Sequence, residues 1–115
     1  MTEWLRVCAL DDLVPDRGAA ALVGGRQVAL FRLVDPPDVH AVDHCDPFSH
    51  ANVMARGLVG SRGGTPTVAS PMHKQSFNLR TGQCLDDADV ALQVWPTRVV
   101  DGWVEVRIEA RSGAA

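Results

Sequence analysis

The residues best suited to chemistry gather in one stretch of the chain, from Ala69 to Leu79. This stretch contains Ser70, His73, Lys74 and Gln75. Imidazole is the commonest metal ligand in proteins and titrates near neutral pH, so His73 could bind a metal or transfer a proton. A lone histidine is more often a surface or hydrogen-bonded structural residue. Metal chemistry at His73 therefore requires further ligands nearby.

The other histidines and the cysteines do not supply those ligands at a spacing typical of metal sites. They are His40, His44, His50, Cys8, Cys45 and Cys84. His44 and Cys45 are adjacent, so in a strand their side chains would point to opposite faces. The chain also lacks a G-x-S-x-G nucleophile elbow, and neither Gly24-Gly25 nor Gly63-Gly64 leads into a helix that could hold a phosphate. No catalytic residue and no metal site are predicted.

The composition indicates one globular domain without a nucleic-acid-binding surface. The chain has 115 residues, of which 46% are hydrophobic and 22% are charged, and its net charge is −3. Nucleic acid is therefore not an expected partner. No apolar run approaches the roughly 20 residues that cross a bilayer, and residues 1–4 lack the basic region of a signal peptide. We expect no membrane association and a cytoplasmic protein, in which three widely spaced cysteines remain as free, buried thiols.

Short alternating segments predict an all-β fold. Strands are expected at residues 4–10, 19–23, 28–34, 39–43, 65–69, 77–79, 84–85, 90–100 and 103–109. Gly24-Gly25 and Asp101-Gly102 can adopt the positive φ of tight turns, so each should join two antiparallel neighbours. We predict about nine short antiparallel strands in a small β sandwich or incomplete barrel. Residues 1–110 form this single domain, and residues 111–115 are predicted as a disordered tail.

One long segment and a set of apolar residues complete the predicted architecture. Residues 46–64 lose the alternation and accumulate glycine, which predicts a long loop with one helical turn at 50–55. Loops of this length in a compact domain are usually functional. The predicted core is Leu5, Val7, Leu22, Val28, Leu30, Phe31, Val42, Phe77, Leu79, Val99, Val104, Val106 and Ile108, with Trp95 and Trp103 partly buried.

Two loops of the chain resemble those of the Rieske domain. One ends in Met54-Ala55-Arg56-Gly57, and the other is Ser70-Pro71-Met72-His73-Lys74-Gln75-Ser76-Phe77. In Rieske proteins a C-x-H loop and a C-x-x-H loop hold a [2Fe-2S] cluster, with two cysteines on one iron and two histidines on the other. The resemblance implies a Rieske-like β fold for nearly the whole chain.

The ligands of such a cluster are largely replaced in this sequence. Counting back from Gly57 places Pro47 and Ser49 at the Cys and His positions of the first loop, and the second loop places Ser70 and His73 at its own. Only His73 keeps a ligand type. A serine hydroxyl is a poor anionic ligand at neutral pH, so a conventional cluster is not expected.

A longer pattern is similar to the small subunit of assimilatory NAD(P)H-dependent nitrite reductase. It comprises residues 56–60, the run from Ser70 to Asp87, and the segments 94–99 and 102–106. In that family the Rieske-like fold commonly lacks the cluster ligands. The resemblance implies a chain without its own cofactor and a large catalytic partner subunit. That partner is expected to carry FAD, an iron-sulfur cluster and sirohaem and to reduce nitrite to ammonium.

Three functions follow as hypotheses. The first is an accessory subunit that docks on the large subunit through the two former ligand loops, with Arg56, His73, Lys74 and Gln75 as contact residues. The alternative is a Rieske-type electron-transfer protein with an atypical [2Fe-2S] cluster. The third is a stand-alone binding domain or small enzyme, because a fold does not by itself fix a function. Iron and sulfide content would separate the first two.

Overall fold

The computed structural model describes residues 2–34, 37–72 and 74–109, and within them it is built from ten strands and two single-turn 3₁₀ helices. The strands are β1 (Thr2–Ala9), β2 (Gly18–Val23), β3 (Arg26–Leu33), β4 (Asp38–Asp43), β5 (Leu58–Arg62), β6 (Thr65–Ala69), β7 (Ser76–Asn78), β8 (Val94–Trp95), β9 (Thr97–Val100) and β10 (Trp103–Glu109). The 3₁₀ helices are η1 (Leu10–Asp12) and η2 (Met54–Arg56). In the described residues neither helix has the length needed to cross a membrane. His73 and the predicted tail 111–115 lie outside the described residues.

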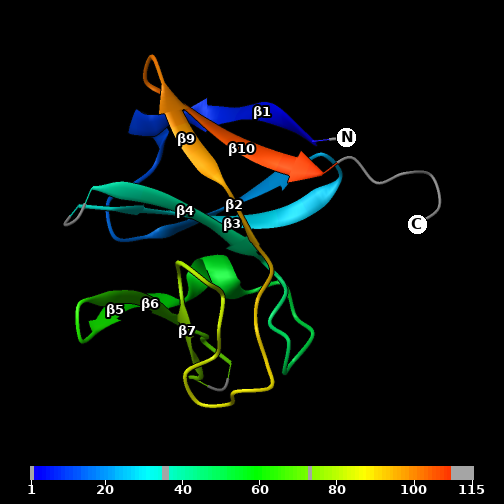
Figure 1. Cartoon of the computed structure of the whole chain (residues 1–115), viewed down its shortest axis with the longest axis vertical. Helices are drawn as coiled ribbons and strands as arrows, with labels where there is room; N and C mark the ends of the chain where they lie inside the picture. The colour runs from blue at the N-terminus through cyan, green and yellow to red at the C-terminus, as the bar shows by residue number, and fades with distance from the viewer. Residues whose placement is uncertain (1, 35–36, 73, 110–115) are drawn as a thin grey trace.

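The strands form three antiparallel sheets stacked along the molecule (Figure 1). Their strand orders are β1-β10-β9, β2-β3-β4-β8 and β5-β6-β7, and the sheet β2-β3-β4-β8 lies in the middle. Pro96 separates β8 from β9, so that the chain passes there from the middle sheet into the upper one. The sheets do not close into a barrel. The all-β prediction is confirmed, with ten strands in place of about nine.

The middle sheet is buried on both faces, which explains the unbroken apolar run in β3. Alternate residues point to opposite faces of a strand, so Ala29 and Phe31 enter one apolar cluster while Val28 and Leu30 enter another. The first cluster lies toward η2, β6 and β7, and the second lies toward β10. The predicted core is confirmed for Val28, Leu30, Phe31, Val42, Phe77, Leu79, Val104, Val106 and Ile108.

Three residues predicted to be core or partly buried are exposed: Leu22 by 70%, Val99 by 46% and Trp103 by 40%. Leu22 points outward from β2 because the alternate positions Ala21 and Val23 pack inward. Val99 lies on the edge strand β9, where it lines an open surface groove. Trp103 lies on the outward face of β10, where a guanidinium from β1 stacks on its ring. Leu5, Val7 and Trp95 are half-buried.

The prediction of a continuous loop over residues 46–64 is wrong for its second half. Strand β5 pairs with β6 across a turn at Gly63-Gly64, where φ is +55° and +83°. Being an edge strand, β5 is mostly exposed, so it does not show the alternation of a half-buried strand. The single helical turn also lies at Met54–Arg56, later than expected. The predicted strand at 84–85 and the first part, 90–93, of the predicted strand 90–100 are reduced to isolated bridges. The rest of that predicted strand is divided at Pro96 into β8 and β9.

Replacing two glycines by alanine tests how tightly the loop after β7 packs. Gly82 has φ +81°, and a Cβ there would lie 2.1 Å from the carbonyl oxygen of Leu92. Gly64 has φ +83° but open space around it. Gly64→Ala should cost about 1–3 kcal/mol of left-handed strain, and Gly82→Ala should cost more because the backbone at Leu92 must move. Urea unfolding measures both, and equal losses would contradict close packing at Gly82.

Candidate functional site

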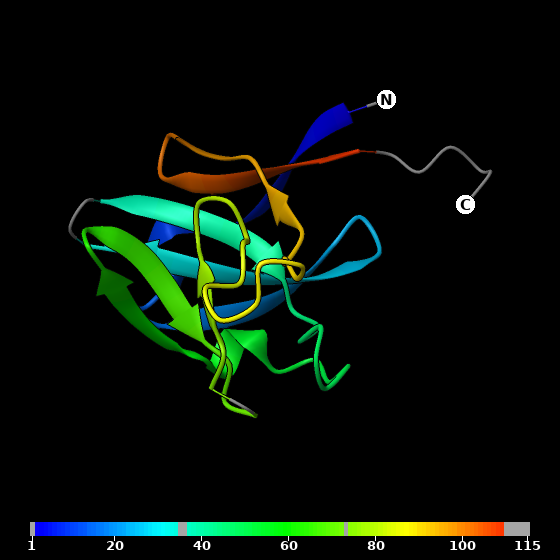
Figure 2. The same cartoon turned by 60° about the horizontal axis from the view of Figure 1, so that its bottom comes forward.

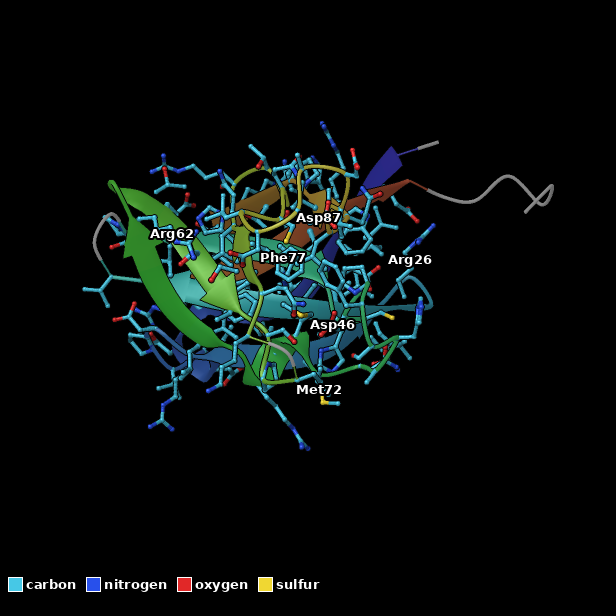
Figure 3. All side chains as sticks on the ribbon, turned by 90° about the horizontal axis from the view of Figure 1, so that it is seen from below. Arg26, Asp46, Arg62, Met72, Phe77 and Asp87 are labelled. Carbon is cyan, nitrogen blue, oxygen red and sulfur yellow. The ribbon has the colours of Figure 1, made fainter. Side chains whose placement is uncertain are left out.

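The two loops singled out by the sequence meet at the end of the molecule that Figure 3 shows from below. The first loop comprises residues 44–53, between β4 and η2, and the second comprises residues 70–75, between β6 and β7. Within the part of the loops that the structure describes, one side-chain hydrogen bond joins them: the Ser70 hydroxyl donates to Asp46 Oδ2 at 2.5 Å. Asp46 is 0% exposed and Ser70 is 1% exposed. The loops are therefore joined by a polar pair that water does not reach.

Within the first loop, Asp46 organises the backbone through hydrogen bonds to Phe48, Ser49, His50 and Ala51. Its Oδ1 accepts from the Phe48 N–H at 2.8 Å. Its carbonyl oxygen accepts from the His50 N–H at 2.7 Å, and its own N–H donates to the Ala51 carbonyl at 2.8 Å. His50, four residues after Asp46, has φ +62°. These hydrogen bonds close residues 46–51 into a compact turn within the loop.

The second loop repeats this pattern around Ser70. The Ser70 hydroxyl oxygen accepts from the Met72 N–H at 3.3 Å. Its carbonyl oxygen accepts from the Lys74 N–H at 2.9 Å, and its N–H donates to the Gln75 carbonyl at 2.9 Å. Lys74, four residues after Ser70, also has φ +62°. Asp46 and Ser70 therefore hold the same position in two loops of like conformation.

The Asp46 carboxylate is stabilised in its charged form. Burial alone would raise the pKa of Asp46, but hydrogen bonds from the Ser70 hydroxyl and the Phe48 and Ser49 N–H groups outweigh it and hold the pKa below its ordinary value. A carboxylate that accepts several hydrogen bonds is favoured over its protonated form. At neutral pH the two loops are thus joined by a charge-assisted hydrogen bond, the stronger kind.

His44 fixes the end of the first loop and the start of η2. Its Nδ1 accepts from the Ala55 N–H at 3.1 Å, and its carbonyl oxygen accepts from the Val53 and Met54 N–H groups at 3.0 Å. Burial lowers the pKa of His44, an effect that Asp43 opposes and Arg56 reinforces. A neutral imidazole in this tautomer serves as the acceptor for η2. His44 therefore acts as a structural acceptor here.

The structure places the predicted site residues as follows. Pro47 and Ser49 are half-buried in the first loop, Ser70 is buried, Arg56 and Lys74 are exposed, and Gln75 is half-buried. The Gln75 Oε1 is buried without a hydrogen-bond partner among the described residues. Sequence reasoning missed Asp46 and the exposed Met72. The one available signal for Asp46 was the repetition of a polar residue before proline, in Asp46-Pro47 and Ser70-Pro71.

The residues at this site do not fit a [2Fe-2S] cluster. The two side chains that meet between the loops are a carboxylate and a hydroxyl, already paired with each other. Cys45 is adjacent, but burial, Asp43 and Asp46 raise the pKa of its thiol, which disfavours the thiolate that iron requires. Across residues 2–34, 37–72 and 74–109, no three His, Cys, Asp or Glu side chains are grouped as metal ligands. All three cysteines are free, and only Cys84 is fully buried as predicted.

Comparison with known proteins supports the family indicated by the sequence. Residues 3–107 match the Rieske-like [2Fe-2S] domain. A crystal structure from Mycobacterium tuberculosis, assigned as an NADH-dependent nitrite reductase small subunit, is 50% identical with a TM-score of 0.90, over 96% of this chain and 99% of that one. The nitrite reductase (NADH) small subunit of Salmonella typhimurium is 41% identical over 107 residues, 93% of this chain and 99% of that protein. The nitrite reductase NAD(P)H large subunit of Klebsiella oxytoca is 44% identical over 103 residues, 90% of this chain and 11% of that protein.

The energetic contribution of the Asp46–Ser70 pair can be measured. Ser70→Ala leaves a buried carboxylate short of one donor and should cost about 2–3 kcal/mol, and Asp46→Asn removes the charge assistance. Because the two groups contact each other, the double variant should lose less than the sum of the single variants. Urea unfolding at pH 7 measures the four-protein cycle, with Ser76→Ala, a half-buried hydroxyl on β7, as the control. Strict additivity would show that the two groups do not interact.

The same pair makes the stability depend on pH in a defined direction. The pKa of Asp46 is lower in the folded than in the unfolded chain, where it is about 3.9. The charged Asp46 carboxylate therefore contributes fully to the free energy of unfolding above that pH. This contribution is lost as the pH falls toward the folded pKa. Asp46→Asn should lack this loss, which unfolding curves collected between pH 7 and pH 3 would test.

Proposed function

The chain belongs to the Rieske-like [2Fe-2S] domain family and, within it, to the nitrite reductase small subunits, and we propose that it is a cofactor-free accessory subunit that docks on the large catalytic subunit. The observation that carries the proposal is the match within the Klebsiella oxytoca large subunit, where one polypeptide includes a segment like this chain. A covalent link holds a domain near its partner at a high effective concentration. A separate chain of the same type needs a docking surface to reach the same arrangement.

In the proposed complex the chemistry belongs to the large subunit. That subunit would hold FAD, an iron-sulfur cluster and sirohaem and reduce nitrite to ammonium with electrons from NADH or NADPH. The present chain offers a hydrogen-bonded pair, Asp46 and Ser70, where an electron carrier would need thiolates. Its contribution is therefore to bind and position, and the proposed location of the complex is the cytoplasm.

The two loops present residues suited to such docking. Met72 is 51% exposed, and Figure 3 shows its side chain at the outer boundary of the molecule. Lys74 follows in the same loop, and Arg56 is next to the start of that loop because Gly57 packs against the Ala69 carbonyl. Both cations are exposed, and neither forms an ion pair within the described residues. A flexible apolar side chain on a loop that carries one cation and adjoins another suits an acidic partner surface with an apolar part.

The remaining members of the predicted contact set are His73 and Gln75. Gln75 brings a buried carbonyl oxygen, Oε1, that has no partner among the described residues. A partner donor, or a water held at the interface, would satisfy it. His73 remains in the set on the basis of its sequence position alone. We keep both as proposed contacts beside Arg56, Lys74 and Met72.

The alternative, a Rieske-type electron carrier with an atypical cluster, makes an opposite prediction for the isolated protein. Protein purified without oxygen and incubated with ferrous iron and sulfide should stay colourless, with iron far below two atoms per chain, because the two loops lack a thiolate pair. An iron and sulfide assay with a visible spectrum measures this. A brown protein with a paramagnetic signal on reduction would establish the alternative.

Charge reversal at the loops tests the docking surface. The double variant R56E/K74E should weaken binding to the large subunit about tenfold or more, since it places two carboxylates against an acidic surface. Co-elution and titration by calorimetry with the purified large subunit measure the change. The expected effect should shrink at high salt because exposed charges are screened.

The chain offers a charge-matched control at the opposite end. Arg6 and Arg107 are exposed on the sheet β1-β10-β9, which lies at the other end of the molecule from the two loops (Figure 1). R6E/R107E changes the net charge by the same amount and should bind nearly as the unmodified chain does. Equal weakening by both double variants would show that net charge alone matters. No weakening by R56E/K74E would place the docking surface elsewhere.

A further inference from the structure

We infer that Asp46 and Ser70 occupy the positions of the two cysteines that hold one iron of a Rieske cluster, and that their hydrogen bond joins the two loops in place of that iron. This inference deepens the proposed function and rests on it for the absence of a cluster in the unmodified chain. It identifies which residues of the first loop replaced the ligands.

The equivalence of the two loops carries the inference. Ser70 begins the pattern S-x-x-H, in which it stands where C-x-x-H has its cysteine. Asp46 makes the same backbone hydrogen bonds as Ser70, to the residues four and five positions further on. Each side chain also accepts from the N–H two residues later. The fourth residue after each has φ +62°. Asp46 is therefore the Cys position of the first loop.

This assignment shifts the register of the first loop by one residue. Counting back from Gly57 gave Pro47 and Ser49, whereas the loop geometry gives Asp46 and Phe48 with the same C-x-H spacing. The first loop thus contains one more residue before Gly57 than the count assumed. Pro47 then corresponds to Pro71, so both loops contain the same polar-proline pair.

The side chains at the reassigned positions 46 and 70 complement each other as hydrogen-bond acceptor and donor, and no metal is needed between them. Asp46 supplies an acceptor and Ser70 supplies a donor, and the two meet where two thiolates would share an iron. Phe48, at the histidine position, packs against the apolar cluster with its ring centroid 6.2 Å from that of Phe77. A loop prepared for a metal would leave its ligands without partners. Here the carboxylate, the hydroxyl and the ring are all satisfied by protein groups.

A swap of the pair tests the equivalence directly. If the two positions are equivalent, D46S/S70D exchanges acceptor and donor, and the introduced carboxylate can accept from the Met72 N–H as Asp46 does from Phe48. Each single variant, D46S or S70D, should have a lower melting temperature than the unmodified chain. The swapped protein should recover at least half of the loss shown by the less stable of the two. A swap no more stable than that single variant would overturn the inference.

Rebuilding a cluster tests the register. D46C/F48H/S70C and P47C/S49H/S70C each introduce two cysteines and one histidine and keep His73. After anaerobic incubation with ferrous iron and sulfide, only the first variant should gain about two irons per chain and visible absorption. A cluster in the second variant, or in neither variant while both stay folded by circular dichroism, would overturn the register. If either variant fails to fold, the D46S/S70D variant is the test of whether positions 46 and 70 are equivalent.

The unmodified chain is treated in parallel, which separates this inference from the proposed function. Iron uptake by the unmodified chain would contradict a cofactor-free subunit. The swap result reports on the equivalence of Asp46 and Ser70 whether or not the chain docks on a large subunit.

Discussion

A buried hydrogen bond between Asp46 and Ser70 is the interaction on which the arrangement of the two loops depends. The residues are 24 positions apart in the chain, so this contact joins segments that leave different sheets. Burying a carboxylate is costly unless its oxygens are hydrogen-bonded. Here one oxygen accepts from Ser70 and the other from the Phe48 N–H. The same carboxylate therefore shapes its own loop and connects it to the neighbouring loop.

The stacked sheets make this contact possible by fixing where each loop begins. Strand β4 of the middle sheet leads into the first loop, and β6 of the lower sheet leads into the second, as Figure 2 allows the reader to follow. Between the loops and the middle sheet, η2 packs closely, since a Cβ on Gly18 would lie 2.2 Å from the Ala55 carbonyl oxygen. His44 accepts from the Ala55 N–H on the other side. The loops are thus supported on elements with little freedom to shift.

Most of the fold could be predicted from the sequence because it depends on local patterns. Alternation gave most of the strands, and Gly24-Gly25 and Asp101-Gly102 form the expected positive-φ turns. Edge elements were harder, since β5 has one neighbour and is mostly exposed. The site was harder still, because Asp46 and Ser70 are identified by a contact between distant segments. Counting from Gly57 fixes a register only if the loop length is known, and one extra residue changes which side chain faces Ser70.

The replacement of cluster ligands by an internal hydrogen bond also bears on what this end of the molecule can do. A Rieske loop needs thiolates and imidazoles that face a metal, and these groups would be poorly satisfied without it. In this chain Asp46, Ser70 and Phe48 are satisfied by one another or by the core, so the loops keep their shape without a metal. The exposed side chains of Met72 and Lys74 take no part in this internal pairing. The two loops therefore keep a Rieske-like arrangement around an interior that is hydrogen-bonded and packed within the protein, and their exposed side chains are the groups that the proposed docking would use.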